Sequence, residues 1–314
     1  GVGFLFAATG TLNMADMGGR LATLGDSPVV QAGFAFIVVG LGIKAAMFPL
    51  HGWLPGAYSY APSLIAIFLA ATATKASIYL MARFVFDVFP DGAAFGQGFI
   101  AWVLAPLAGT AAIVCSIQAV FEKEIRRMLA FSSVAQVGFI LLGLSLATVA
   151  GASAGLFYLA AHALMKMTLF MALGGLAISI GARRLDELAG VARDAPWSAA
   201  AFAIGAASLA GVPLTLGFLA KWRLVAAALE AGQIWIVAVL AIASLLTLLY
   251  IGRMIEAIFF RPAPAGAPRA REAPVGVLAP LWILAGLSLW FGIDASLPEQ
   301  LANAAGQALI GGAP

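Results

Sequence analysis

The sequence predicts an all-α integral membrane protein. The chain of 314 residues is 63% hydrophobic and only 10% charged, and its mean hydropathy is +1.02. Soluble domains are about half apolar and about a quarter charged, so this composition is typical of a membrane protein. The apolar runs are about 20 residues long, which suits spanning helices rather than the alternating ten-residue strands of an outer-membrane barrel.

Apolar runs separated by short polar links define the expected helices. A partial helix is expected first, at the start of the chain, over 1–12. Eight complete spans follow, over 28–50, 60–88, 99–120, 128–149, 154–180, 198–226, 232–260 and 275–293.

Two of these spans carry helix-breaking residues. Pro49 and Pro55 flank the end of the first complete span, and Gly211 with Pro213 interrupts the span over 198–226. Proline frees backbone carbonyls, which membranes tolerate where they face protein or a water-filled cavity. Broken helices are a frequent device of ion carriers, while simple packing kinks are the alternative reading.

The loop charges predict an orientation. Nine cations fall in three alternate loops, at 121–127, 181–197 and 261–274. An excess of Lys and Arg marks the cytoplasmic side, so these loops are expected inside and the C-terminus outside. The 51–59 link has no Lys or Arg and falls on the cytoplasmic side by alternation alone. The Pro/Ala-rich third loop is expected to be an extended linker.

Several site classes are unsupported by the sequence. Cys115 is the only cysteine, so no intrachain disulfide and no cysteine-ligated cluster can form. Two histidines are too few for a dedicated metal cage, and no phosphate-binding glycine motif is present. We expect no cofactor, no metal and no nucleic-acid partner. Gly1 lies in an apolar run with no signal peptide before it, which predicts a piece of a longer chain.

Lysines lie where a membrane protein rarely places them. Lys44, Lys75, Lys166 and Lys221 all fall within predicted spans. An ionisable group at bilayer depth costs about 2.5–3.5 kcal/mol. Stretching to the interface can explain Lys44 and Lys221, which are nearer span ends, but not the other two. Burial disfavours a charged lysine and a nearby carboxylate favours it, so a lysine whose partner comes and goes exchanges a proton.

Other polar residues accompany the lysines. His162 and Lys166 are four residues apart and share a helix face, with the Thr168 hydroxyl nearby. This pattern favours a proton relay over a packing histidine. His51 lies at a helix end, where a structural cap and a proton site are both open. Ser132, Ser133 and Gln136 form a polar stripe that either lines a hydrated path or joins helices.

Five segments carry a family resemblance, in order and spacing. They are GIKAAMFPLHGWLPGAYSYAP, ATATKASIYLMARF, EKEIRRMLAFSSVAQVGF, AAHALMKMTLFMALGG and AGVPLTLGFLAKWRL. They resemble the antiporter-like subunits shared by respiratory complex I and Mrp-type cation/proton antiporters. The resemblance implies fourteen helices with two inverted repeats, of which this chain begins in helix six. Residues 1–90 would then finish the first repeat, 91–260 form the second, and 261–314 supply a linker and the last helix.

The resemblance also implies roles for individual residues. The family's helix-five glutamate, partner of the helix-seven lysine, would lie before Gly1. Lysine rather than glutamate in GFLAKW is more similar to the D-type subunit of Mrp antiporters. By the resemblance, the relay groups of helices seven, eight, eleven and twelve are Lys44, Lys75, His162 with Lys166, and Lys221.

The functional hypothesis is a non-enzymatic, proton-translocating subunit of a multi-subunit Na⁺(K⁺)/H⁺ antiporter. It would lie in the bacterial inner membrane with other membrane subunits and lipid as partners. A proton-pumping subunit of complex I or a related hydrogenase complex is the alternative. An autonomous transporter and a structural or assembly subunit without conduction are the remaining hypotheses.

Overall fold

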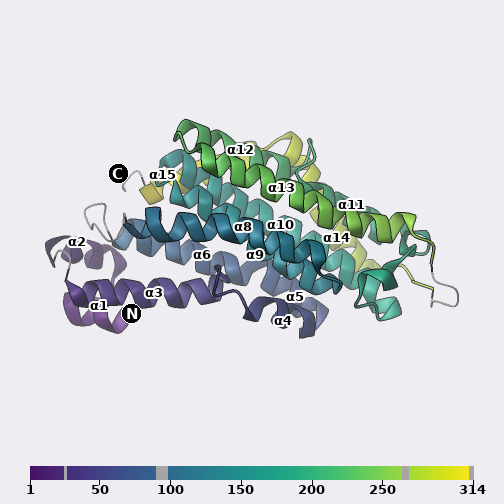
Figure 1. The fold of residues 1–314 in the computed structure, drawn as a ribbon, viewed down its shortest axis with the longest axis horizontal. Helices are drawn as coiled ribbons and strands as arrows, with labels where there is room; N and C mark the ends of the chain where they lie inside the picture. Colours follow the sequence, from purple (N-terminus) through teal and green to yellow (C-terminus); the bar gives the residue numbers. More distant parts are fainter. Residues whose placement is uncertain (25–26, 90–97, 264–268, 311–314) are drawn as a thin grey trace.

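The structure, a computed structural model, describes residues 1–24, 27–89, 98–263 and 269–310, and the regular elements of that part are all helices. The longest of them run side by side along the long axis of the molecule (Figure 1). Within these ranges, seven helical segments are long and apolar enough to cross a membrane. They are Pro28–Ala45, Ser63–Val88, Ile100–Phe121, Ile125–Ser145, Val149–Leu176, Ile234–Phe260 and Val275–Ile293.

These segments confirm seven of the eight complete spans to within a few residues. The principal helices are α3 (Pro28–Ala45), α5 (Ser63–Phe68), α6 (Thr74–Arg83), α8 (Ala105–Phe121), α9 (Ile125–Ser145), α10 (Val149–Ile180), α13 (Ile234–Ile255) and α14 (Val275–Ile293). Five-residue π-helical turns complete several spans: η1 (Leu69–Ala73), η2 (Phe84–Val88), η3 (Ile100–Leu104) and η6 (Glu256–Phe260).

The eighth span is a broken helix, as the sequence predicts. It consists of α11 (Pro196–Ala210) and α12 (Leu216–Glu230). Gly211 ends α11 in the left-handed conformation with φ 88°, which glycine adopts without steric cost. The N–H of Val212 donates to the Ala207 carbonyl at 2.9 Å and closes the helix end.

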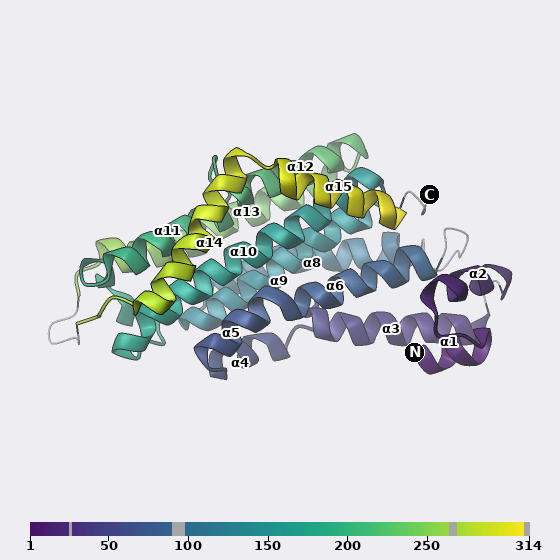
Figure 2. The same cartoon turned by 180° about the vertical axis from the view of Figure 1, so that it is seen from behind.

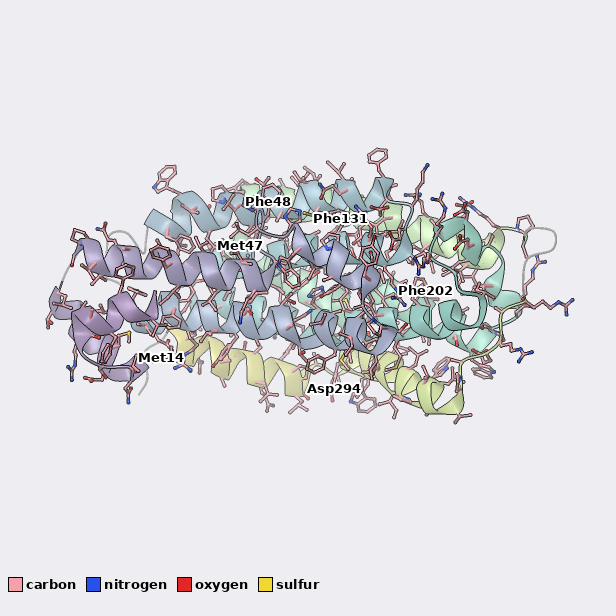
Figure 3. All side chains as sticks on the ribbon, turned by 90° about the horizontal axis from the view of Figure 1, so that it is seen from below. Met14, Met47, Phe48, Phe131, Phe202 and Asp294 are labelled. Atoms are coloured by element: carbon pink, nitrogen blue, oxygen red, sulfur yellow. The ribbon has the colours of Figure 1, made fainter. Side chains whose placement is uncertain are left out.

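The predicted link at 51–59 is wrong, because most of it is helical. Helix α3 ends at a left-handed Ala46, and after a turn containing Pro49 the chain forms α4 (Trp53–Tyr60). Figure 3 labels Met47 and Phe48 at this break. Pro55 lies within the first turn of α4, a position that needs no N–H donor, and so does not end a helix.

Two further helices differ from the expectation. The partial helix is α1 (Val2–Thr9), but the segment after it forms α2 (Met14–Leu24) instead of a loop. After the last predicted span the chain continues as α15 (Ser296–Ile310), which packs along α10. Figure 3 labels Asp294 at the junction of α14 and α15.

Helix α9 forms the centre of the bundle. In its most apolar stretch 89% of the residues lie buried within the structure, against 17% in α14. Small residues bring the neighbouring backbones close, since a Cβ on Gly138 would lie 2.6 Å from the Ala108 carbonyl oxygen of α8. Helix α10 packs against α9 and also against α5 and η1, so the N-terminal and central segments share one core. The predicted 90/91 repeat boundary lies outside the described residues.

The described parts of the cation-rich loops gather at one end of the molecule. The N–H of Ile125 donates to the Arg183 carbonyl and that of Leu185 to the Lys123 carbonyl, each at 3.0 Å. Gly190 likewise donates to the carbonyl of Ala257 at 3.0 Å. The described end of α15 and the turn between α12 and α13 lie at the opposite end (Figures 1 and 2).

Candidate functional site

Lys166 lies in the middle of the bundle. Its side chain comes from α10 and is completely buried. The Nζ donates to the Leu129 carbonyl of α9 at 3.0 Å and to the hydroxyl of Ser132. Ser132 in turn donates to the same carbonyl at 2.9 Å. Ser132, for which the sequence left a hydrated path and a helix contact both open, therefore contacts Lys166 directly.

Lys75 lies on α6 directly after the π-helical turn η1. It is 5% exposed, and its Nζ donates to the carbonyl of Ala70 within that turn. A π-helical turn shifts the backbone bonding by one residue and leaves a carbonyl available to a side chain. The local widening of the helix thus supplies the acceptor for the ammonium.

His162 lies within electrostatic range of both lysines. It is completely buried, and the charges of Lys75 and Lys166 both interact electrostatically with its imidazole ring. Neither ring nitrogen has a hydrogen-bond partner among the described residues, so the neutral ring has one free donor and one free acceptor. Thr168 does not join this group directly, since its hydroxyl donates to the Leu164 carbonyl at 2.9 Å.

Lys221 uses the break between α11 and α12. Its partly buried side chain turns back so that the Nζ donates to the Ala210 carbonyl at 2.9 Å. That carbonyl belongs to the last turn of α11, where no further helical N–H follows to satisfy it. The Nζ also lies 5.8 Å from the ring centroid of Phe139. The predicted helix break therefore provides the acceptor for the Lys221 ammonium.

Each of these three lysines is held by a main-chain carbonyl. In the part of the chain that the structure describes, the ion pairs are formed by arginines and none involves a lysine. Burying an ammonium without a counter-ion favours loss of its proton. A carbonyl can hold either protonation state in place, because it accepts a bond from an ammonium or from a neutral amine.

Lys44 differs from the other three lysines. It is exposed at the end of α3, beside a pocket of about 370 Å³ lined also by Trp53, Ala73 and Ser77. The indole of Trp53 donates to the Ile43 carbonyl at 2.7 Å and closes one side of the pocket. Its exposure agrees with its place near the end of the span, and its role in proton transfer stays a prediction.

The remaining predicted residues separate into two places. Ser133 donates to the Leu129 carbonyl at 2.9 Å, and the Gln136 side chain accepts from Tyr158. His51 is 9% exposed and stacks on Phe48 at 5.3 Å, within the turn that follows α3. It also lies 3.9 Å from the Cys115 sulfur and shows no contact with the relay lysines among the described residues.

Sequence reasoning missed two tyrosines in this region. Tyr158 of α10 and Tyr250 of α13 are completely buried; the Tyr158 hydroxyl donates to Gln136 and the Tyr250 hydroxyl donates to Thr247 at 3.3 Å. A buried hydroxyl needs a partner, so a tyrosine four residues before His162 was a signal within the sequence.

Comparison with known proteins agrees with this geometry. The family described as NADH:quinone oxidoreductase/Mrp antiporter, TM, matches residues 1–247. The chain belongs to this family. The resemblance inferred from five motifs is thereby confirmed, and so is the all-α antiporter-like fold.

Relatives in the family come from two kinds of complex. The chain is 44% identical over 296 residues to the N-type subunit of the NADH-quinone oxidoreductase of Desulforudis audaxviator, covering 90% of this chain and 59% of that protein. It is 30% identical over 311 residues to the D-type subunit of the Na⁺/H⁺ antiporter of Bacillus subtilis, covering 99% and 62%. The chain thus spans about three fifths of the length of these relatives.

Solved structures of several membrane complexes contain a chain that superposes on this one. A chain in the Mrp complex of Dietzia sp. superposes with a TM-score of 0.88 at 30% identity, covering 98% of this chain and 64% of that one. A chain of respiratory complex I from Thermus thermophilus gives 0.77 at 27% identity, covering 95% and 64%. Both settings fit, and neither is favoured over the other.

Proposed function

We propose that the chain is a proton-translocating subunit of a multi-subunit membrane complex, a multi-pass membrane protein without an enzymatic site of its own. The observation that carries this proposal is the set of three lysines, two of them buried and each bonded to a main-chain carbonyl: Lys75, Lys166 and Lys221. Buried lysines are costly in a membrane and accompany charge movement. Arginine would stay protonated and could not serve.

We propose that the proton passes along these three lysines from Lys75 toward Lys221. Lys75 and Lys166 are coupled electrostatically to His162 and to each other. Like charges in a low-dielectric interior repel strongly, so a proton arriving at one site favours release from the next. Lys221 at the helix break would be the terminal group. Lys44, at its open pocket, would be the first group if a carboxylate from another segment or another chain of the complex covers it.

The relatives supply two settings for this transport. One is a Na⁺(K⁺)/H⁺ antiporter of the Mrp type, in which the chain would resemble the D-type subunit. The other is complex I, in which it would resemble the N-type subunit. In both, other membrane subunits and lipid surround the chain, and the cation-rich loops would face the cytoplasm.

Reconstitution of the complex that contains the full-length chain tests the proposal. Proton movement into liposomes is followed with a pH-sensitive dye, driven either by a Na⁺ or K⁺ gradient or by NADH with quinone. Proton flux driven by a Na⁺ or K⁺ gradient would assign the chain to an Mrp-type antiporter. Proton flux driven by NADH and quinone would assign it to complex I. Absence of flux under both drives, from a complex that is otherwise intact, would leave the structural or assembly role.

A further inference from the structure

The last two helices of the chain lie beside the broken helix formed by α11 and α12. Just before α14, the Glu272 carboxylate bonds to main-chain N–H groups at the start of α11. Near the end of α14, the Ser288 hydroxyl donates to Ser208 Oγ of α11 at 3.0 Å. Glu299 of α15 pairs with Arg223 of α12 at 2.7 Å. Helices α14 and α15 together therefore follow the same course as α11 and α12 (Figure 2).

The junction of α14 and α15 meets the break between α11 and α12. A Cβ on Gly292, near the end of α14, would lie 2.4 Å from the Leu214 carbonyl oxygen and 2.6 Å from the Thr215 carbonyl carbon. The missing side chain lets the two backbones approach closely. Leu214 and Thr215 separate two helices of 15 residues each, so they lie near the middle of that span. The junction of α14 and α15 therefore lies at the same depth.

Asp294 lies at this junction and its side chain is exposed (Figure 3). Its Oδ1 accepts from the N–H of Ser296, the first residue of α15, at 3.0 Å. This bond satisfies one of the free donors at the start of the helix. The carboxylate forms no ion pair within the part of the chain that the structure describes. An unpaired acid thus lies on the surface of the bundle, halfway along a span.

The surface around Asp294 is apolar. Ile293 is 72% exposed, Trp290 62% and Leu297 56%. At this depth, such a surface faces either lipid tails or another protein chain. Lipid tails offer neither a cation nor a hydrogen-bond donor, and charged side chains within membranes pair with one another or face a polar interior. Lipid headgroups and water lie at the two membrane surfaces, so a partner for this carboxylate has to come from protein.

We propose that Asp294 is the ionic contact of an interface with a neighbouring membrane subunit, which presents a lysine or arginine from an otherwise apolar helix. The cation meets the carboxylate at the α14–α15 junction, and Trp290, Ile293 and Leu297 pack around the pair. The relatives of the chain are subunits of complexes, so a neighbouring subunit is expected in either setting. The contact goes beyond the proposed proton transport and does not depend on it.

The first test is Asp294→Asn in the full-length chain, expressed with the other subunits of its complex. Asparagine keeps the oxygen that caps α15 and removes the charge. The amount of intact complex on a native gel is expected to fall about tenfold, because the partner's cation is left buried and unpaired. The matched control is Glu230→Gln. Glu230 is also exposed and without an ion pair among the described residues, but it lies at the end of α12.

The control variant is expected to assemble like the wild type. Wild-type amounts of complex in Asp294→Asn would overturn the proposal. An equal loss in Glu230→Gln would do the same, because the loss would then not depend on the depth of the charge.

The second test identifies the partner. Ile293 is replaced by a photoreactive benzophenone amino acid, and the purified complex is irradiated. Mass spectrometry should find the adduct on an apolar helix of another subunit, next to a lysine or arginine. Asp294→Lys should then abolish assembly, and exchanging the partner's cation for aspartate should restore it. Adducts with lipid alone, or no rescue by the charge exchange, would overturn the proposal and leave the transport hypothesis untouched.

Discussion

At the scale of residues, the sequence predicted that Lys75 and Lys166 are buried, but not which groups hold them. Burial of Lys75, Lys166 and His162 followed from their places in the middle of apolar runs. Their carbonyl acceptors depend on a π-helical turn and on a neighbouring helix, which no residue pattern specifies. Lys44 lies near the end of its span, and the sequence left open whether it is buried there or reaches the interface.

Ser132 and Ser133 offer a matched pair for testing the Lys166 site. Both are buried and donate to the Leu129 carbonyl, but only Ser132 accepts from Lys166 among the described contacts. A hydrogen bond to a charged group contributes about 1.5–3 kcal/mol, which corresponds to a change of roughly tenfold or more in a protonation equilibrium. Ser132→Ala is therefore expected to lower proton flux about tenfold. The loss in Ser133→Ala should be much smaller, and equal losses would contradict a specific role for Ser132.

At the scale of elements, long apolar spans were predictable and short helices were not. The breaks at Pro49 and at Gly211–Pro213 carried clear signals. Helices α2 and α15 are short and less apolar, so nothing in their sequence distinguished them from loops. Tertiary contacts hold α15 in place: Arg223 of α12 pairs with Glu299 at 2.7 Å, and Gly306 lies against Ser153 of α10.

Alanine substitutions at Gly211 and Gly232 test whether a loss of proton flux comes from backbone strain or from a change at Lys221. Both have positive φ, at 88° and 70°. A Cβ at Gly211 would lie 3.0 Å from Lys221 Cδ, whereas a Cβ at Gly232 meets nothing within 4 Å. Alanine at either position is expected to cost about 1–2 kcal/mol, measured as a lower Tm of the purified complex. Only Gly211→Ala should also impair proton flux. Impaired flux in Gly232→Ala would show that strain alone explains the loss.

Glu272 joins the segment after η6 to the start of α11. Its carboxylate accepts from the N–H groups of Trp197 at 3.0 Å and Ser198 at 2.9 Å, and from the Ser198 hydroxyl. Partial burial alone would raise the pKa of the Glu272 carboxyl, but these hydrogen bonds outweigh it and hold the pKa below its usual value.

The lowered pKa of Glu272 determines how the stability of the fold changes with pH. The stabilisation by the Glu272 carboxylate is complete above the pKa of the unfolded state, near 4.5. It is lost as the pH falls through the lower pKa of the folded state. We expect the Tm of the wild type to drop below about pH 4.5 and that of Glu272→Gln to depend less on pH there. Parallel pH profiles for the two proteins would contradict the assignment.

At the scale of the whole molecule, the alternating loop charges predicted which loops meet. The three cation-rich loops do lie at one end, joined by main-chain hydrogen bonds between the segments around Lys123, Arg183 and Gly190. Their assignment to the cytoplasmic side, and of the C-terminus to the outside, stays a prediction based on positive charge.

Cysteine labelling from one side of the membrane tests this orientation. Cys115 is buried and should react little with a maleimide, so the labelling of an introduced cysteine can be measured against a low background. Arg193→Cys lies in a cation-rich loop and Gln233→Cys in the turn between α12 and α13, at opposite ends. An impermeant maleimide should label Gln233→Cys in intact cells and Arg193→Cys only in inverted vesicles. The reverse pattern would contradict the predicted topology.

The central claim is that buried lysines carry the proton, and replacing them tests it most directly. Lys75→Met and Lys166→Met remove the charge with little change in side-chain length, while Lys123→Met does the same at an exposed loop position. The measurement is proton flux by the reconstituted complex, with assembly checked for every variant. The account predicts that both buried variants assemble and lose flux, and that Lys123→Met transports normally. Full flux in Lys75→Met and Lys166→Met would contradict it.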